Sequence, residues 1–502
     1  MPTALPKTDA IGRNHNKSKA ASAMRISRRF RLRATQYELD FVDIDTDRDT
    51  PLFLDPVYLG NRTDAWSLDA SRTLHNFFQT FVSMVREGAR ETARNLFNHL
   101  HEPNETCLGL SRDRPRGNAI GEVDSEKLFD SIVESRAVAT GVVADLEDFR
   151  LFIPGIDRDK VSDMTTNIIR KHLIQYTQNQ CALWDIPVQN DVQSGYYWDA
   201  RQRTWVNAFT SMLVIDNKRI LLTPKGVVSY SRKYTPRKYY RKFVLEFLQH
   251  EQLNQRGSVL VQHRRDGTPY VTKKSLEETI APYSKEFLTS FTEGHPEVFR
   301  EFKQWIKETA TPISNSEIVD DDVRPIARFL IERLRQVPTG NQHATAYHRL
   351  VVGILELLLY PDVTSPVVEQ EIHEGRKRID ISLDNAATNG FFFRLHTTYE
   401  TPSQFIFVEC KNYSTEVANP ELDQLAGRFS TNRGKFGLLV CRAVDDMDTL
   451  LRRCNDTYTD HRGTILPIVD DDLVTMLTSA GEGISRPYEQ FLTQRFREVA
   501  LR

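Results

Sequence analysis

The chain has 502 residues, which is too long for one hydrophobic core and predicts two or three domains. Its 66 lysine and arginine residues nearly balance 68 acidic residues, so the net charge of −2 excludes a global attraction to nucleic acid or membrane. Five scattered cysteines without a CxxC pair exclude a zinc ribbon and favour a reducing compartment. Without a leader-like segment or a membrane-length apolar run, we expect a soluble cytoplasmic protein.

The N-terminal part mixes expected strands and helices. Residues 1–24 are polar and rich in Lys, Asn, Ser and Ala, which predicts a disordered tail. Polar and apolar residues then alternate at period two through 25–45, which predicts strands. We expect helices at 68–99, 125–149 and 162–181. A hairpin is predicted at 211–223, with Asp216 and Asn217 at its turn.

A strongly amphipathic helix is predicted to begin at Thr235 and Pro236, with Thr235 as its N-cap. One side of this helix carries a basic stripe of four residues: Arg237, Lys238, Arg241 and Lys242. Such a stripe can follow the phosphates of DNA, or it can simply be the solvated face of the helix. The four residues are therefore predicted as a possible DNA-binding set.

A further helix is expected at 287–309, and the polar, proline-containing segment 310–323 is predicted to be a linker. This divides the chain into an α+β recognition or regulatory region at 25–320, open to further subdivision, and a C-terminal domain at 321–502.

The C-terminal domain is predicted to be a mixed α/β sheet with flanking helices. Its expected strands lie at 368–373, 378–383, 405–411, 436–442 and 464–469. Its expected helices lie at 323–336, 344–360, 419–432 and 445–456, with a tight turn at Gly375 and a loop at 391–395.

The segment FVECKNYS places charged residues on an apolar strand. Glu409 and Lys411 are two residues apart and point to the same face. If the strand holding Asp380 pairs with this one, the two carboxylates converge and repel unless a cation such as Mg²⁺ or Mn²⁺ lies between them. Lys411 would then orient or deprotonate water, or stabilise charge on a phosphate, as phosphodiester hydrolysis requires. An ordinary ion pair is the alternative.

GRKRID followed by VECKNY resembles the D…ExK signature of the PD-(D/E)XK, or restriction-endonuclease-like, nuclease superfamily. Over about residues 340–470, the sequence pattern is similar to that of Mrr-like and bacterial defence nucleases. The resemblance implies that Asp380 and Glu409 bind the metal, helped by the Cys410 carbonyl, and that Lys411 is the catalytic lysine. It also implies that Gln424 contacts the site. The position on the first core helix stays open between His348 and Glu356.

We therefore expect a Mg²⁺- or Mn²⁺-dependent endonuclease acting on double-stranded DNA. The resemblance implies a role in restriction or anti-phage defence, with companion proteins such as an ATPase or a sensor. A homo-oligomer is expected, because one site cuts one strand at a time. Two alternatives stay open, namely a repair or recombination nuclease and a catalytically silent nucleic-acid-binding or scaffold module of a defence complex.

Overall fold

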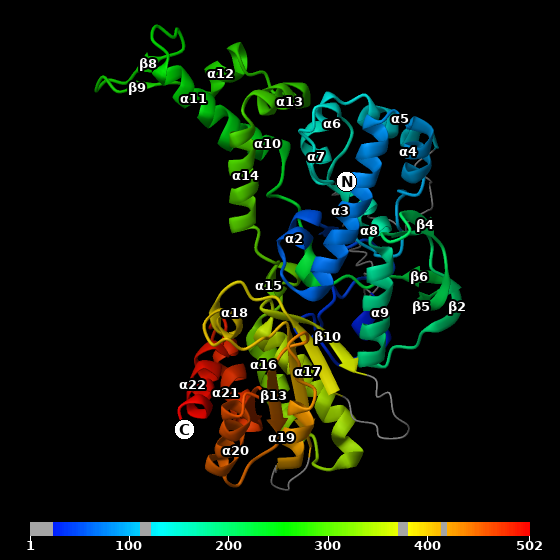
Figure 1. Ribbon diagram of the computed structural model, residues 1–502, viewed down its shortest axis with the longest axis vertical. Coiled ribbons are helices and arrows are strands. Elements are labelled where there is room, and N and C mark those ends of the chain that lie inside the picture. The colour runs from blue at the N-terminus through cyan, green and yellow to red at the C-terminus, as the bar shows by residue number, and fades with distance from the viewer. Residues whose placement is uncertain (1–23, 111–121, 370–379, 413–418) are drawn as a thin grey trace, which may run out of the picture.

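The computed structural model describes residues 24–110, 122–369, 380–412 and 419–502. Figure 1 shows an elongated molecule, with a sheet and its helices at one end and a mainly helical region at the other. The chain is a mixed α/β protein whose C-terminal part holds a five-stranded mixed sheet, which confirms the predicted fold class at that level. None of the helices in these ranges has the length and apolar character that crossing a membrane requires. The predicted tail lies almost entirely outside the described residues.

The N-terminal region is mainly helical. Its helices are α1 (Ile26–Arg29), α2 (Pro56–Asn61), α3 (Ala65–Arg86), α4 (Arg90–Phe97), α5 (Glu122–Val133), α6 (Arg136–Ala139), α7 (Asp148–Phe152), α8 (Arg158–Ile168), α9 (Arg170–Trp184), α10 (Pro236–Tyr239), α11 (Leu245–Asn254), α12 (Lys273–Thr279), α13 (Lys285–Gly294), α14 (Pro296–Thr309) and α15 (Asn315–Ile318). A 3₁₀ turn, η1 (Lys225–Val227), and a π-helical turn, η2 (Tyr240–Val244), complete the set.

The strands of this region are short and form small antiparallel pairs and one three-stranded sheet, β2-β5-β6. They are β1 (Phe53–Leu54), β2 (Gln189–Gln193), β3 (Tyr197–Asp199), β4 (Thr204–Val206), β5 (Phe209–Ile215), β6 (Lys218–Ile220), β7 (Val228–Ser229), β8 (Gln262–His263) and β9 (Pro269–Tyr270). The predicted hairpin is confirmed, because Ile215 pairs with Lys218 across Asp216 and Asn217. Both turn residues have positive φ angles, as a type I′ turn requires.

The predicted strands at 25–45 are wrong. Residues 26–29 form the short helix α1, and the segment that follows makes only isolated bridges, such as Phe41 with Pro224. Every residue from 36 to 45 is buried, so the alternation does not mark a solvent face. Its carboxylates are held by side chains and backbone of other segments instead. Asp43 accepts hydrogen bonds from both the backbone and the hydroxyl of Ser27, at 2.9 and 2.6 Å.

Two further predictions are corrected. The helix expected at 125–149 is divided into α5, α6 and the start of α7, since Gly141 adopts a positive φ of 83° that interrupts a helix. The expected loop at 391–395 lies within the helix α18 (Gly390–Thr397), because Phe391, Phe392 and Leu395 form one buried helical face. The turn predicted at Gly375 falls outside the described residues.

The C-terminal sheet has the order β10-β11-β12-β13-β14. β11 runs antiparallel to both of its neighbours, β10 and β12, and β12, β13 and β14 are parallel. The strands are β10 (Val363–Glu369), β11 (Asp380–Asn385), β12 (Phe405–Lys411), β13 (Phe436–Cys441) and β14 (Thr464–Val469). Apart from α18, the accompanying helices are α16 (Val323–Gln336), α17 (Ala344–Leu359), α19 (Asn419–Ala426), α20 (Met447–Thr459), α21 (Asp470–Gly481) and α22 (Glu489–Ala500), with a 3₁₀ turn at η3 (Asn341–His343).

Two hydrophobic cores organise the described chain, and they do not divide at residue 320. One core lies wholly in the helical region, from Leu54 to Ile306. The other joins the C-terminal sheet to N-terminal segments, and it contains both Ile26 and Val499. The predicted boundary between the two domains therefore crosses a shared core, so the N-terminal segments help to build the body that carries the sheet.

A buried polar cluster links these parts. Lys225 Nζ lies 3.1 Å from a carboxylate oxygen of Glu356 on α17, and both side chains are almost completely buried. Asp40 accepts hydrogen bonds from the Tyr176 hydroxyl at 2.6 Å and from the Ser365 backbone at 3.0 Å. Burial raises the pKa of Asp40 and of Glu356, while Lys225 opposes both shifts.

Asp384 on β11 provides a pH-dependent contribution to stability. Burial, assisted by the nearby Asp64, raises its pKa to about 7 from an ordinary value of 3.8. Between these values the folded chain keeps a proton that the unfolded chain has lost, so the free energy of unfolding falls as pH rises. One such proton contributes a slope of up to about 1.4 kcal/mol per pH unit.

Asp384→Asn is therefore expected to flatten the decline in stability between about pH 4 and pH 7. The amide oxygen of asparagine can still accept the hydrogen bond from the Trp66 backbone. Urea unfolding at a series of pH values measures the effect. Asp191→Asn, at an exposed position of β2, is the matched control and should leave the profile unchanged. An Asp384→Asn profile that follows the wild type would contradict this assignment.

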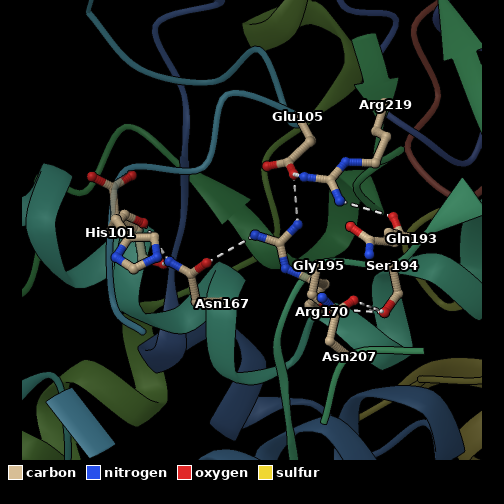
Figure 2. A network of polar contacts seen from close by, with 10 residues as sticks. His101, Glu105, Asn167, Arg170, Gln193, Ser194, Gly195, Asn207 and Arg219 are labelled. Carbon is tan, nitrogen blue, oxygen red and sulfur yellow. Dashed lines mark hydrogen bonds and ion pairs between the residues drawn. The ribbon is translucent and has the colours of Figure 1, made fainter. Parts of the chain in front are cut away.

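A second polar cluster lies in the N-terminal region and is shown in Figure 2. One carboxylate oxygen of Glu105 accepts hydrogen bonds from Arg170 at 2.8 Å and from Arg219 at 2.9 Å. Gly195, with a φ of 74°, runs against both guanidinium groups, and a Cβ there would lie 3.2 Å from each. Arg170 also donates to Asn167. These contacts tie α8, α9, β6 and the loop after α4 together, which is a structural role.

Candidate functional site

The site is built on β12, a strand buried along nearly its whole length. Its odd-numbered residues face α19 and the turn after it. The ring of Phe407 contacts that of Phe429, and Lys411 contacts Gln424. The sequence produces this arrangement because side chains alternate along a strand, so Phe407, Glu409 and Lys411 share one face. The charged residues occupy its C-terminal end, beside the parallel strand β13.

Glu409 and Lys411 form a buried ion pair. Lys411 Nζ lies 2.5 Å from Glu409 Oε1, and the two residues are only 6% and 2% exposed. The other carboxylate oxygen, Glu409 Oε2, is buried and receives no hydrogen bond from the residues that the structure describes. Arg428 Nη1 lies 3.7 Å from this oxygen. A buried carboxylate oxygen without a donor is costly unless a ligand or cation satisfies it.

Gln424 is placed at this site, as predicted. Its side-chain oxygen lies 3.4 Å from Lys411 Nζ, so it helps to fix the position of the ammonium group. Asn412, the next residue along the strand, binds the segment before α17 through its amide, which donates to the carbonyls of Pro338 and Gly340. The end of β12 is thereby held from two sides, by α19 and by this segment.

His348 lies on α17 and reaches the same strand end. Its Nε2 is 2.9 Å from the carbonyl oxygen of Cys410. Because a carbonyl can only accept, Nε2 carries the proton. Burial lowers the pKa of His348, which favours the neutral ring, and its Nδ1 is buried without a partner among the described residues. Of the two first-helix candidates, His348 is the one that adjoins the site.

Glu356 is not brought to this site. It lies two helical turns further along α17, where it pairs with Lys225. The four residues of the basic stripe are not brought there either, because α10 and η2 belong to the other end of the molecule (Figure 1).

Asp380 begins β11, and its backbone is paired with that of Glu369 on β10. On its other side β11 pairs with β12, in a register that sets Ile381 opposite Val408. One further step in this register brings position 380 level with position 409. The predicted convergence of the two strands is thus present in the backbone.

The site offers oxygen ligands of the kind that Mg²⁺ and Mn²⁺ prefer. The fit depends on Glu409 Oε2, which is a buried acceptor without a donor. Within the described side chains there is no group of three or more His, Cys, Asp or Glu residues that could hold a metal. A complete ligand set would therefore need Asp380 in addition to Glu409 and the Cys410 carbonyl. Of this donor set, the described side chains and backbone supply the Glu409 carboxylate and the Cys410 carbonyl.

Arg428 and Asn412 were missed in the sequence. Both contribute to the site, since Arg428 lies near Glu409 and Asn412 anchors the strand end. Arg428 lies in the turn that follows α19, which ends at Ala426, so no helical spacing in the sequence pointed to it. Asn412 had no distinguishing signal beyond its position next to Lys411.

The fold and site define a mixed α/β protein with a buried carboxylate–lysine pair at the end of a central strand. Residues 31–235 match a protein family described as Domain of unknown function (DUF8370). This match covers less than half of the chain and ends before the C-terminal sheet begins. No curated protein and no solved structure matches the chain.

Proposed function

We propose that the chain is a metal-dependent endonuclease that hydrolyses phosphodiester bonds of DNA, with its catalytic domain in the C-terminal sheet. The observation that carries the proposal is the Glu409–Lys411 pair, buried on one face of β12 with one carboxylate oxygen left without a donor. The order of strands and helices around it suits the restriction-endonuclease-like core that the sequence resembles. A role in restriction or anti-phage defence, with companion proteins, follows from that resemblance.

The residues have separate roles in this proposal. Glu409, Asp380 and the Cys410 carbonyl would hold Mg²⁺ or Mn²⁺, which when bound polarises a phosphoryl oxygen and lowers the pKa of water. Lys411, steadied by Gln424, would orient the attacking water or stabilise charge on the phosphate. His348 would have to release the Cys410 carbonyl, or share it, when the ion is held.

A catalytically silent nucleic-acid-binding module is the second candidate. The observation that favours it is that two atoms needed for catalysis already have partners. Lys411 is paired directly with Glu409, and the Cys410 carbonyl accepts from His348. In a protein without catalytic activity, these contacts would serve only the stability of the fold.

Cleavage by the purified full chain separates these candidates. We expect nicking or linearisation of supercoiled plasmid DNA with Mg²⁺ or Mn²⁺, abolished by EDTA and by Glu409→Gln. Lys127→Ala, at an exposed position of α5, is the control for the loss of a charged side chain and should cleave normally. Absence of cleavage with either ion, on plasmid, linear duplex and phage DNA, would contradict the proposal and favour the silent module.

A further inference from the structure

Positive charge is concentrated in one projecting part of the molecule. Residues 232–274, here called the basic arm, contain eleven lysine and arginine residues but only three acidic ones, in a chain whose charges nearly balance overall. The arm runs from α10 through η2 and α11 to the hairpin of β8 and β9 and on to the start of α12. Figure 1 shows the α11 helix and the hairpin extending away from the body, at the end opposite the C-terminal sheet.

A groove on the arm is lined mainly by lysine and arginine residues. Its volume is about 420 Å³, and it is bordered by Thr235, Arg237, Lys238, Arg241, Lys242, Glu246 and Lys273. The four stripe residues gather here because spacings of three and four place side chains together on a helix. The π-helical turn at Tyr240–Val244 lies within this stripe, and such turns are frequent at functional sites.

The four stripe cations are not neutralised by carboxylates. Within the described ranges, Arg237, Lys238, Arg241 and Lys242 form no ion pair. The acidic residue of the groove, Glu246, is engaged by Lys273 at 2.8 Å. Four adjacent cations without a carboxylate partner among the described residues repel one another, so binding an anion would be favourable.

Aromatic rings hold these cations in position. Lys242 Nζ lies 4.0 Å from the ring centre of Trp305, and Lys238 lies 5.5 Å from the same ring. Arg237 lies 5.1 Å from the ring of Tyr283. Because the cations cover these rings, the rings are poorly placed to stack with unpaired bases. The groove therefore suits the phosphates of a duplex better than the bases of a single strand.

The tip of the hairpin adds a second group of cations. Arg264 and Arg265 are exposed at the turn between β8 and β9, which Gly267 closes with a φ of 82°. The helix between the stripe and this hairpin, α11, is about 15 Å long. Duplex DNA carries one negative charge per about 1.7 Å of its axis. Its phosphates therefore continue along the length of α11, and a single duplex can contact both groups of cations.

We propose that the basic arm binds the phosphate backbone of duplex DNA without sequence preference, and that it does so independently of cleavage at Glu409. The identity of the bound nucleic acid as DNA rests on the proposed function, whereas the contact with phosphates rests on the cations of the arm. The arm would hold the substrate at a point remote from the site on β12.

The test measures binding of the full chain to a fluorescent 30-base-pair duplex by anisotropy, in EDTA, over a range of salt concentrations. Replacing all four stripe residues by glutamine should raise Kd at least tenfold at 100 mM salt. It should also lower the steepness of the plot of log K against log salt by about 3 to 4, because each lost phosphate contact removes about 0.9. Arg264→Gln with Arg265→Gln, remote from both cores, should give a smaller change in the same direction.

The matched control is Arg328→Gln with Arg335→Gln, since both arginines are exposed on the helix α16. Unchanged affinity in the stripe variant, an equal loss in the control, or tighter binding of single strands than of duplex would each overturn the proposal. Because EDTA removes the divalent ions that cleavage would require, the binding result does not depend on the proposed nuclease activity. Binding that depends on the stripe, in a chain that never cleaves, would support the arm and reject the nuclease.

Discussion

Replacing Lys411 by methionine is expected to abolish cleavage while the chain still folds. The ammonium group lies 2.5 Å from Glu409, closer than Arg428, whose Nη1 is 3.7 Å from the other carboxylate oxygen. Loss of a group that moves a proton or stabilises developing charge lowers turnover by on the order of 10² to 10⁴. The rate of plasmid nicking, compared at equal concentrations of folded protein, measures the loss.

The same substitution leaves Glu409 buried without its close partner, which would also cost stability. The double variant Glu409→Gln with Lys411→Met separates the two effects, because it removes both charges. We expect it to regain thermal stability but no activity. Activity that recovers together with stability, or a single variant with more than a tenth of the wild-type rate, would contradict a catalytic role for Lys411.

Replacing Lys225 by methionine is expected to destabilise the protein strongly. Lys225 is completely buried, and its ammonium group lies 3.1 Å from Glu356 and 4.2 Å from the ring centre of Tyr360. Removing one member of a buried pair leaves the other charge uncompensated and costs about 3 to 5 kcal/mol. The shift of the urea unfolding midpoint measures this cost.

The matched variant is Lys225→Met with Glu356→Leu, which replaces the pair by apolar side chains of similar size. It should recover most of the lost stability, since an apolar pair is often as stable as a buried ion pair. A single substitution that costs less than about 1 kcal/mol would show that the interaction is weak, as surface pairs are. In that case the Lys225–Glu356 pair would not join the two parts of the chain.

Features of the fold that depend on neighbouring residues were easier to predict from the sequence than features that depend on tertiary contacts. The turn at Asp216 and Asn217 and the N-cap at Thr235 depend on neighbouring residues, and both predictions are confirmed. The strands predicted at 25–45 are absent because the carboxylates of this segment are buried and accept hydrogen bonds from the hydroxyl groups of Ser27 and Tyr176. Periodicity in the sequence cannot reveal such contacts. Tertiary contacts of this kind override local patterns.

The candidate site was predictable in part for the same reason. Glu409 and Lys411 share a face because they lie two apart on one strand, and Gln424 follows on the next helix. The choice between His348 and Glu356 could not be made, because both lie on α17 and only packing decides which end meets β12. Glu356 proved to belong to the cluster around Lys225.

The shared core also has a consequence for synthesis on the ribosome. Ile26 emerges early and Val499 near the end, yet both belong to one core. At about 5 to 20 residues per second, some 25 to 100 s separate them. During this interval the N-terminal residues of the core lack the part that the C-terminal sheet contributes, so some of their apolar surface stays exposed on the nascent chain. The nuclease activity proposed for the C-terminal sheet would also be absent until the sheet is complete.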